Sequence, residues 1–138
     1  MTKEIQMNWL EDMAFQTDLD GHRLVVDADD SVGGKNRGPR PKGLLLVSLA
    51  GCTAMDVISI LKKMREPVGW FNLKVSGNLT EEHPKKFTDF KVIYQFKKSD
   101  GLNPQNVQKA VELSQNKYCG VSATLRDAHD VAWEIEYI

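Results

Sequence analysis

Two cysteines are the residues of this chain best suited to chemistry, and their surroundings differ. Cys52 lies in the most apolar stretch of the sequence, Gly43 to Leu61, whereas Cys119 follows a second helical segment. They are too far apart in sequence for a local CxxC redox or zinc motif. Two such thiols can cycle between dithiol and disulfide. The alternative is that each is a buried cysteine that packs as a small hydrophobic residue.

The composition limits the class of protein that could hold this pair. The 138 residues fit one domain, which we expect to span 1–138. A net charge of −1 and a pI near 6.3 give no field that would favour nucleic acid or an anionic membrane. The N-terminal residues show no apolar segment behind a basic one, so we expect no signal peptide. Two cysteines without a secretion signal suit a reducing cytoplasm, which is the expected location.

The stretch around Cys52 is almost long enough to cross a bilayer, so it is either a membrane span or a helix buried in a protein core. It contains Asp56, and a carboxylate within a membrane is costly. We therefore expect a helix buried in a protein core. This helix should run to about Arg65 and end before Pro67 and Gly69.

The rest of the chain alternates apolar and polar residues in the manner of half-buried strands. An N-terminal strand over residues 7–15 should turn at Asp18–Gly21 and return as His22–Val26. Asn103 and Pro104 are typical of an N-cap and first helical residue, and predict an amphipathic helix after them. Further strands are expected at residues 71–75, 90–96 and 131–137. The pattern predicts an α+β fold with antiparallel sheet.

An all-round apolar helix raises the question of what covers its second side. Six strands from one chain can cover only one side of it. We expect the other side to meet a second copy in a two-fold homodimer. The alternative is a monomer whose sheet curls around the helix.

Two segments together resemble a known family. The run Gly38-Pro-Arg-Pro-Lys-Gly-Leu-Leu-Leu-Val-Ser-Leu-Ala-Gly-Cys-Thr-Ala-Met-Asp-Val57 resembles the signature of the OsmC/Ohr proteins, named for osmotic induction and organic hydroperoxide resistance. Cys119-Gly-Val-Ser122 resembles the second motif of that family, usually Cys-Pro-Val-Ser. The order of elements also fits, so the resemblance covers nearly the whole chain. The amino-acid sequence around Cys52 is most similar to that of the OsmC-like redox-protein branch.

The resemblance implies antiparallel sheets around a long buried central helix, in an intertwined homodimer with active sites at its interface. It also implies a thiol-dependent peroxidase of the oxidative stress response. Cys52 would attack an organic hydroperoxide and become a sulfenic acid, and Cys119 would resolve this acid as a disulfide. An external dithiol, for which a lipoylated protein is one candidate, would reduce the disulfide. No metal or organic cofactor is implied. An apolar site would favour organic hydroperoxides over hydrogen peroxide.

A thiol in an apolar helix needs a nearby cation to become a thiolate. In the family this cation is an arginine from the N-terminal hairpin, oriented by a glutamate at the start of the central helix. Here the position of the glutamate holds Lys42 and Gly43, and the arginine position falls near Leu19. Arg40 is our choice among the nearby arginines, which also include Arg23 and Arg37. Its alternative role is that of a solvated arginine in a basic turn.

These departures leave a second function open: a non-catalytic dimeric OsmC-like domain that binds a small apolar ligand at its interface. Asp56 shares a helix face with Cys52, four residues away. It could orient an arginine from the partner chain, or be a buried acid satisfied by the backbone or a basic neighbour. The residues His22, His83, His129 and Asp127–Asp130 show no spacing typical of metal ligands, so no metal site is expected among them.

Overall fold

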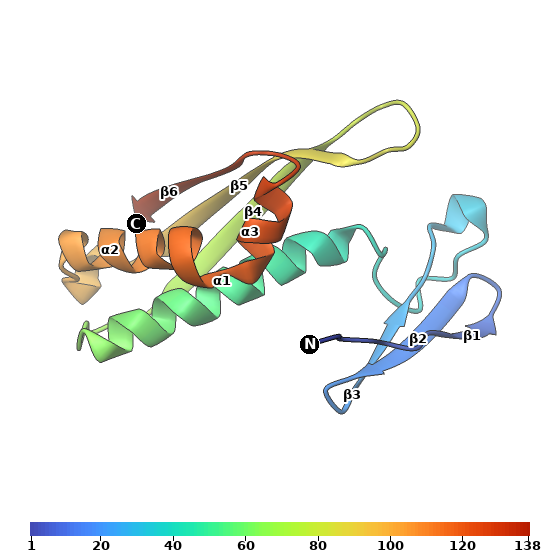
Figure 1. Ribbon diagram of the computed structural model, residues 1–138, viewed down its shortest axis with the longest axis horizontal. Helices are drawn as coiled ribbons and strands as arrows, with labels where there is room; N and C mark the ends of the chain where they lie inside the picture. Colours follow the sequence, from blue (N-terminus) through green and yellow to red (C-terminus); the bar gives the residue numbers. More distant parts are fainter. The chain divides into compact units, whose positions relative to one another are not determined.

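The computed structural model describes residues 1–138, which divide into two compact units, Met1–Leu45 and Leu46–Ile138. Each unit has its own three-stranded sheet, with strand order β1-β2-β3 in the first and β4-β5-β6 in the second (Figure 1). The strands expected from sequence are therefore distributed over two separate sheets. The α+β class predicted from the sequence is confirmed.

The first unit is an antiparallel meander of β1 (Asn8–Glu11), β2 (Ala14–Leu19) and β3 (His22–Val26). The single strand expected over residues 7–15 is in fact two strands. The predicted return strand is confirmed, and the turn before it uses Asp20 and Gly21, both at positive φ. An Asp-Gly pair at positive φ is typical of a tight hairpin whose twist matches that of its strands.

The loop after β3 is organised by one buried carboxylate, that of Asp27. It accepts hydrogen bonds from the backbone N–H groups of Ala28 at 2.8 Å, Lys35 at 3.0 Å and Arg37 at 3.1 Å. The bond from Lys35 contributes most to holding the pKa of Asp27 below its ordinary value. Gly38 belongs to the same loop, and a Cβ there would collide with the Val25 carbonyl. The short helix η1 (Asp30–Val32) also lies in this loop.

The second unit contains the remaining elements in the order α1, sheet hairpin, helical crossover and last strand. The long helix α1 (Gly43–Lys63) begins in the last residues of the first unit. The hairpin strands are β4 (Phe71–Leu79) and β5 (Phe87–Phe96), and the final strand is β6 (Val131–Tyr137). Between β5 and β6 lie η2 (Lys98–Asp100), α2 (Pro104–Leu113), the π-helical segment η3 (Ser114–Tyr118) and α3 (Gly120–Arg126).

The last strand differs from the expected antiparallel arrangement. β4 and β5 pair antiparallel, but β6 pairs parallel with β5. The helical crossover returns the chain to the starting end of β5, which is the connection that a parallel pair requires. Within this crossover, α2 starts as predicted, because the Asn103 side chain accepts from the backbone N–H of Gln105 at 3.0 Å. The short helix α3 was not anticipated from the sequence.

One face of α1 is buried in the core of the second unit, together with α2 and the sheet. The buried residues Leu49, Thr53, Val57 and Leu61 recur every four positions and thus form a single stripe. The core residues that share this cluster from other elements are Phe90, Val92, Tyr94 and Phe96 of β5 and Val107, Ala110 and Val111 of α2.

The other side of α1 carries exposed apolar residues, which agrees with the expectation that one chain covers only one side of this helix. Val47 and Met55 are 63% and 72% exposed. The helix is long and apolar enough to cross a membrane, and 22% of its apolar window is buried. Core helices of globular proteins pass the same test of length and hydropathy, so this property alone does not indicate a membrane span.

Candidate functional site

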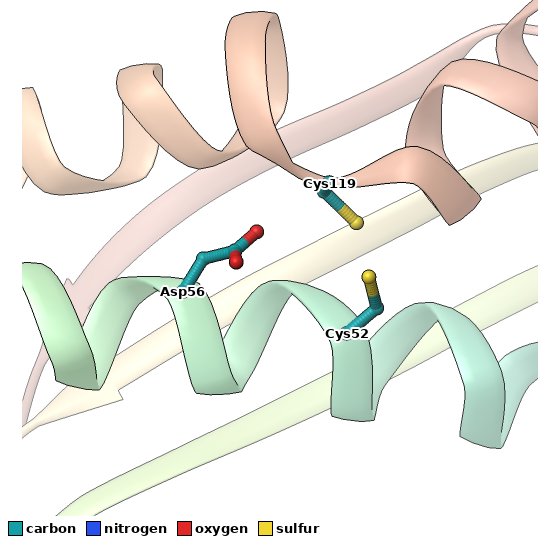
Figure 2. A group of neighbouring side chains, drawn as sticks. All are labelled: Cys52, Asp56 and Cys119. Atoms are coloured by element: carbon teal, nitrogen blue, oxygen red, sulfur yellow. The ribbon is translucent and has the colours of Figure 1, made fainter.

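The fold of the second unit brings the two cysteines together. Cys52 lies in the middle of α1, and Cys119 lies in the link between η3 and α3. Figure 2 shows the two sulfur atoms facing each other, with the Asp56 carboxylate one helical turn from Cys52. Both sulfurs and a carboxylate oxygen of Asp56 lie within 4.8 Å of one another. Both cysteines are free thiols, Cys52 half-buried and Cys119 buried.

The π-helical segment before Cys119 determines where its sulfur points. The wider turn is closed by the backbone N–H of Cys119, which donates to the Ser114 carbonyl at 2.8 Å. Single π-helical turns of this kind occur often at functional sites. Cys119 itself is extended and caps α3, because its Sγ accepts from the backbone N–H of Ser122 at 3.4 Å. The Cys-Gly-Val-Ser motif is thus a cysteine cap on a short helix.

The surroundings of Cys52 disfavour its thiolate. Burial is the main cause that raises its pKa above the ordinary value. A hydrogen bond from the Val121 backbone lowers this pKa, whereas Cys119 and the negative charge of Asp56 raise it further. None of these groups carries a positive charge. Among the groups that shift this pKa, therefore, none is the cation that the sequence analysis requires.

Asp56 is half-buried and has a hydroxyl partner rather than a basic or backbone one. Its Oδ2 accepts a hydrogen bond from the Ser114 Oγ at 3.0 Å. The sequence analysis expected an arginine, another basic neighbour or the backbone as the partner of Asp56, and not a serine hydroxyl. Because Ser114 belongs to the π-helical segment, the bond also ties α1 to the segment that positions Cys119.

A buried row of polar side chains continues from this serine through the core. Ser114 Oγ lies 2.7 Å from Thr53 Oγ1, and Thr53 Oγ1 lies 2.6 Å from Tyr94 Oη. Gln115 Nε2 donates to Tyr94 Oη at 2.6 Å. Arg126 in turn donates to the backbone and side-chain carbonyls of Gln115, at 2.8 and 3.2 Å.

The donors in this row can be assigned from the number of protons available. Each hydroxyl has one proton to donate. Ser114 must give its proton to the carboxylate, so Thr53 donates to Ser114 and Tyr94 donates to Thr53. Burial raises the pKa of Tyr94, which keeps this donor protonated. The result is a one-directional chain from the Arg126 guanidinium to the Asp56 carboxylate, and the hydrogen bonds in such a chain polarise and strengthen one another.

Sequence reasoning missed this row. Its members are scattered over α1, β5, the π-helical segment and α3, so no local spacing connects them. The one available signal was Thr53, a hydroxyl on the stripe of α1 that the apolar residues Leu49 and Val57 share. A polar residue at a core position needs a buried partner.

A pocket of about 320 Å³ adjoins the cysteine pair through Asp56. It mixes apolar walls with one carboxylate and one ammonium group. Its lining residues are Asp56, Ser59, Ile60, Lys63, Leu113 and Tyr118. The pocket is large enough for a small organic molecule.

Arg40 is held by the loop of the first unit. Its guanidinium donates to the Gly38 carbonyl at 2.7 Å and to the Asn36 side chain at 2.8 Å. Arg37 is bound differently, at 2.9 Å from the Asp12 carboxylate. The first turn of α1 contains no acidic residue, which agrees with the missing glutamate. The activating role of Arg40 stays a prediction, as do the catalytic roles of Cys52 and Cys119.

Comparison with known proteins gives one consistent result. Residues 33–134 match the family model described as OsmC-like protein. Protein YhfA of Escherichia coli is 29% identical over 136 residues, which cover 98% of each chain. A hypothetical protein of Aquifex aeolicus has a crystal structure with 27% identity and a TM-score of 0.80, covering 100% of this chain and 98% of the other.

The fold is also that of an organic hydroperoxide resistance protein, OsmC, from Legionella pneumophila. Its structure matches with a TM-score of 0.70 at 16% identity, over 100% of this chain and 98% of that one. At this identity the match concerns the fold alone. The family model, by contrast, covers most of the chain and includes both cysteines, and the chain therefore belongs to the family of OsmC-like proteins.

Proposed function

We propose that this protein is a thiol-dependent peroxidase that reduces organic hydroperoxides. The observation that carries the proposal is that the Cys52 and Cys119 sulfurs face each other within 4.8 Å. Membership of the OsmC-like family supports a redox role. Relatives of the same fold are named organic hydroperoxide resistance proteins, which favours this class of substrate.

In the proposed reaction the Cys52 thiolate attacks one oxygen of the peroxide bond. An S–O bond forms, the O–O bond breaks, and the alkoxide leaves as an alcohol after taking a proton. The sulfenic acid of Cys52 is then attacked by the Cys119 sulfur, and a disulfide forms with loss of water. An external dithiol, with a lipoylated protein as a candidate, restores both thiols by exchange. The two thiols supply both electrons, so no metal or organic cofactor takes part.

The resolving step requires only a local movement. A disulfide has an S–S distance of about 2.05 Å, whereas the free sulfurs lie within 4.8 Å. Rotation of the two side chains, with a small shift of the link between η3 and α3, brings them into range. Because both positions are fixed by helices, the second thiol is present when the sulfenic acid forms, which protects it from further oxidation.

We infer that the working unit is a homodimer in a reducing cytoplasm. Val47 and Met55 on α1 and Trp9 on β1 are apolar and largely exposed within a single chain. Exposed apolar residues of this size on a long helix are typical of an interface. A second copy, related by a two-fold axis, would cover both α1 helices at once. The dimer would also place Cys52 in a drier site, suited to an alkyl hydroperoxide.

Arg40 is the proposed activating cation. The groups that shift the pKa of Cys52 within the second unit do not include a positive charge, so the thiolate must be stabilised by a residue from elsewhere. The loop that bears Arg40 is ordered by Asp27, which would limit the entropy cost of presenting a guanidinium to the sulfur.

The test is to treat reduced protein with cumene hydroperoxide and follow its intact mass, beside Cys52→Ser and Cys119→Ser. We expect rapid loss of two hydrogens in the wild type and no sulfur oxidation in Cys52→Ser. Cys119→Ser should accumulate a sulfenic or over-oxidised Cys52. Reaction of the wild type no faster than a free thiol in solution would refute the proposal.

The second candidate function is binding of a small apolar ligand without catalysis. The observations that favour it are the acid-free first turn of α1 and the pocket beside Asp56. A binding protein would retain a ligand-induced rise in melting temperature after both cysteines are changed to serine. A peroxidase would lose its reaction with the hydroperoxide in the same variant.

A further inference from the structure

The cysteine pair and Asp56 together offer three metal ligands at one place. The three donor atoms lie within 4.8 Å of one another and come from α1 and the link between η3 and α3 (Figure 2). Cys52 and Asp56 are four residues apart on one helix face, a spacing that places two ligands side by side. We propose that the reduced protein binds one Zn²⁺ ion per chain through Cys52, Asp56 and Cys119.

The geometry needs little adjustment. With Zn–S bonds of about 2.3 Å, two sulfurs on a tetrahedral zinc lie about 3.8 Å apart. The present sulfurs lie within 4.8 Å, so they must approach by about 1 Å at most. This movement is smaller than that needed to close a disulfide between the same atoms.

Hydrogen bonds from neighbouring residues hold two of the three proposed ligands in place. The Ser114 hydroxyl holds Oδ2 of Asp56, which leaves Oδ1 for the ion. The chain of hydrogen bonds from Arg126 to Ser114 fixes the position of the hydroxyl that holds this carboxylate. The backbone N–H of Ser122 donates to the Cys119 sulfur and fixes its orientation. Hydrogen bonds of this kind orient the residues that bind a metal, and their loss typically lowers metal affinity 10- to 100-fold.

The donor types select the metal. Two thiolates and one carboxylate suit Zn²⁺, whereas Mg²⁺ and Ca²⁺ require oxygen donors. Three protein ligands leave a fourth position for water or a small ligand, which the pocket beside Asp56 can supply.

Ligation and the redox reaction exclude each other. The two thiols lose one proton each as the ion enters, and a disulfide provides neither thiolate. The site is therefore specific to the reduced protein, and the inference does not depend on peroxidase activity.

The experiment is a titration of full-length, metal-free reduced protein with Co²⁺, followed by displacement with Zn²⁺. The chain contains no cysteines besides Cys52 and Cys119, so a thiolate-to-cobalt charge-transfer band reports this site alone. We expect one ion per chain and displacement of Co²⁺ by Zn²⁺. Oxidation of the two thiols to a disulfide with diamide should abolish binding.

Variants distinguish the ligands. Cys52→Ser and Cys119→Ser should each abolish the two-thiolate spectrum. Asp56→Asn should keep the charge-transfer band but weaken binding by at least about tenfold, and Ser114→Ala should weaken it by about 10- to 100-fold. Glu112→Gln removes one exposed charge on α2 and should bind as the wild type does. Circular dichroism establishes that each variant is folded.

Three results would overturn the proposal. The first is a reduced wild type without the charge-transfer band. The second is an Asp56→Asn variant that binds as tightly as the wild type, because the carboxylate is then not a ligand. The third is a stoichiometry of one ion per two chains, which would mean that thiolates of two copies share a metal.

Discussion

Replacing Asp56 by asparagine should make Cys52 more reactive, because it removes the negative charge beside the sulfur. Burial is the main cause of the raised pKa of Cys52, and the charge of Asp56 adds to it. Asparagine has nearly the same shape, and its carbonyl can still accept the hydrogen bond from Ser114. The substitution therefore changes the charge and leaves the packing of α1 largely intact.

The size of the effect follows from Coulomb's law. At the 4.8 Å limit of the distance between the two groups, a pair of unit charges repels by about 0.9 kcal/mol in water and about 3.5 kcal/mol at an effective dielectric of 20. Both side chains are only half-buried, so the value lies towards the lower end. A loss of about 0.9 kcal/mol raises the thiolate fraction about fourfold.

The rate rises by less than the thiolate fraction, because a less basic thiolate is a weaker nucleophile. With a Brønsted coefficient of about 0.4–0.5, the fourfold gain becomes a rate increase of about twofold. The high-dielectric and low-dielectric limits together bracket the increase between about 2- and 25-fold.

The assay is alkylation of Cys52 by iodoacetamide at pH 7 in a Cys119→Ser background, with a chelator present to exclude metals. Glu112→Gln is the matched control, since it removes one exposed charge elsewhere and should leave the rate unchanged. A slower reaction of the Asp56→Asn variant would refute the reasoning. It would mean that Asp56 holds a cation near the sulfur and so favours the thiolate overall.

Four further outcomes are expected from the structure. In an Arg40→Ala variant, which lacks the proposed activating cation, the alkylation rate of Cys52 should still increase above pH 9.0, the ordinary pKa of a thiol. A rate that reaches its plateau below pH 9.0 would contradict the raised pKa of Cys52. Because the pKa of Cys52 is raised in the folded protein, the thiol of the unfolded chain ionises first as the pH rises. The contribution of this thiol to the free energy of unfolding is therefore present below pH 9.0 and should be lost above it. Urea titrations of the wild type and Cys52→Ser at several pH values measure this difference. Thr53→Val should lower the free energy of unfolding by about 1–3 kcal/mol, because it leaves two buried hydroxyls short of a partner, and an unchanged urea midpoint would contradict this. Val47→Glu combined with Met55→Glu should convert a dimer into monomers, as measured by light scattering. A wild type that is already monomeric would show that no second copy packs on α1.

The sequence was sufficient where local chemistry decides the structure. The N-cap at Asn103 and the Asp-Gly hairpin are set by residues a few positions apart, and both were foreseen. The nearness of Cys52 and Cys119 was implied only by the family resemblance of the two motifs, since the residues between them do not fix a distance. The length of α1 was predicted to within about two residues at its end.

The sequence was insufficient where partners lie far apart along the chain. The parallel pairing of β6 depends on the path of a helical crossover, and an alternating strand reads the same in either direction. The polar row from Arg126 to Asp56 joins four elements through contacts that only the tertiary fold creates. The exposed apolar side of α1 was expected, but its occupant stays a prediction, because hydropathy records which residues avoid water and not which chain shields them.

Asp56 and Arg40 together pose the question of how the thiol is activated, and a double-mutant cycle answers it. The charge of Asp56 raises the pKa of Cys52, so it opposes the Cys52 thiolate unless a cation offsets it. If Arg40 acts on the sulfur directly, Arg40→Ala should slow alkylation by a similar factor with or without Asp56→Asn. If Arg40 acts by pairing with the carboxylate, Arg40→Ala should have little effect once Asp56 is neutral, and the coupling should exceed about 0.5 kcal/mol. No slowing by Arg40→Ala in either background would exclude Arg40 as the activating cation and leave another arginine or the partner chain to supply it.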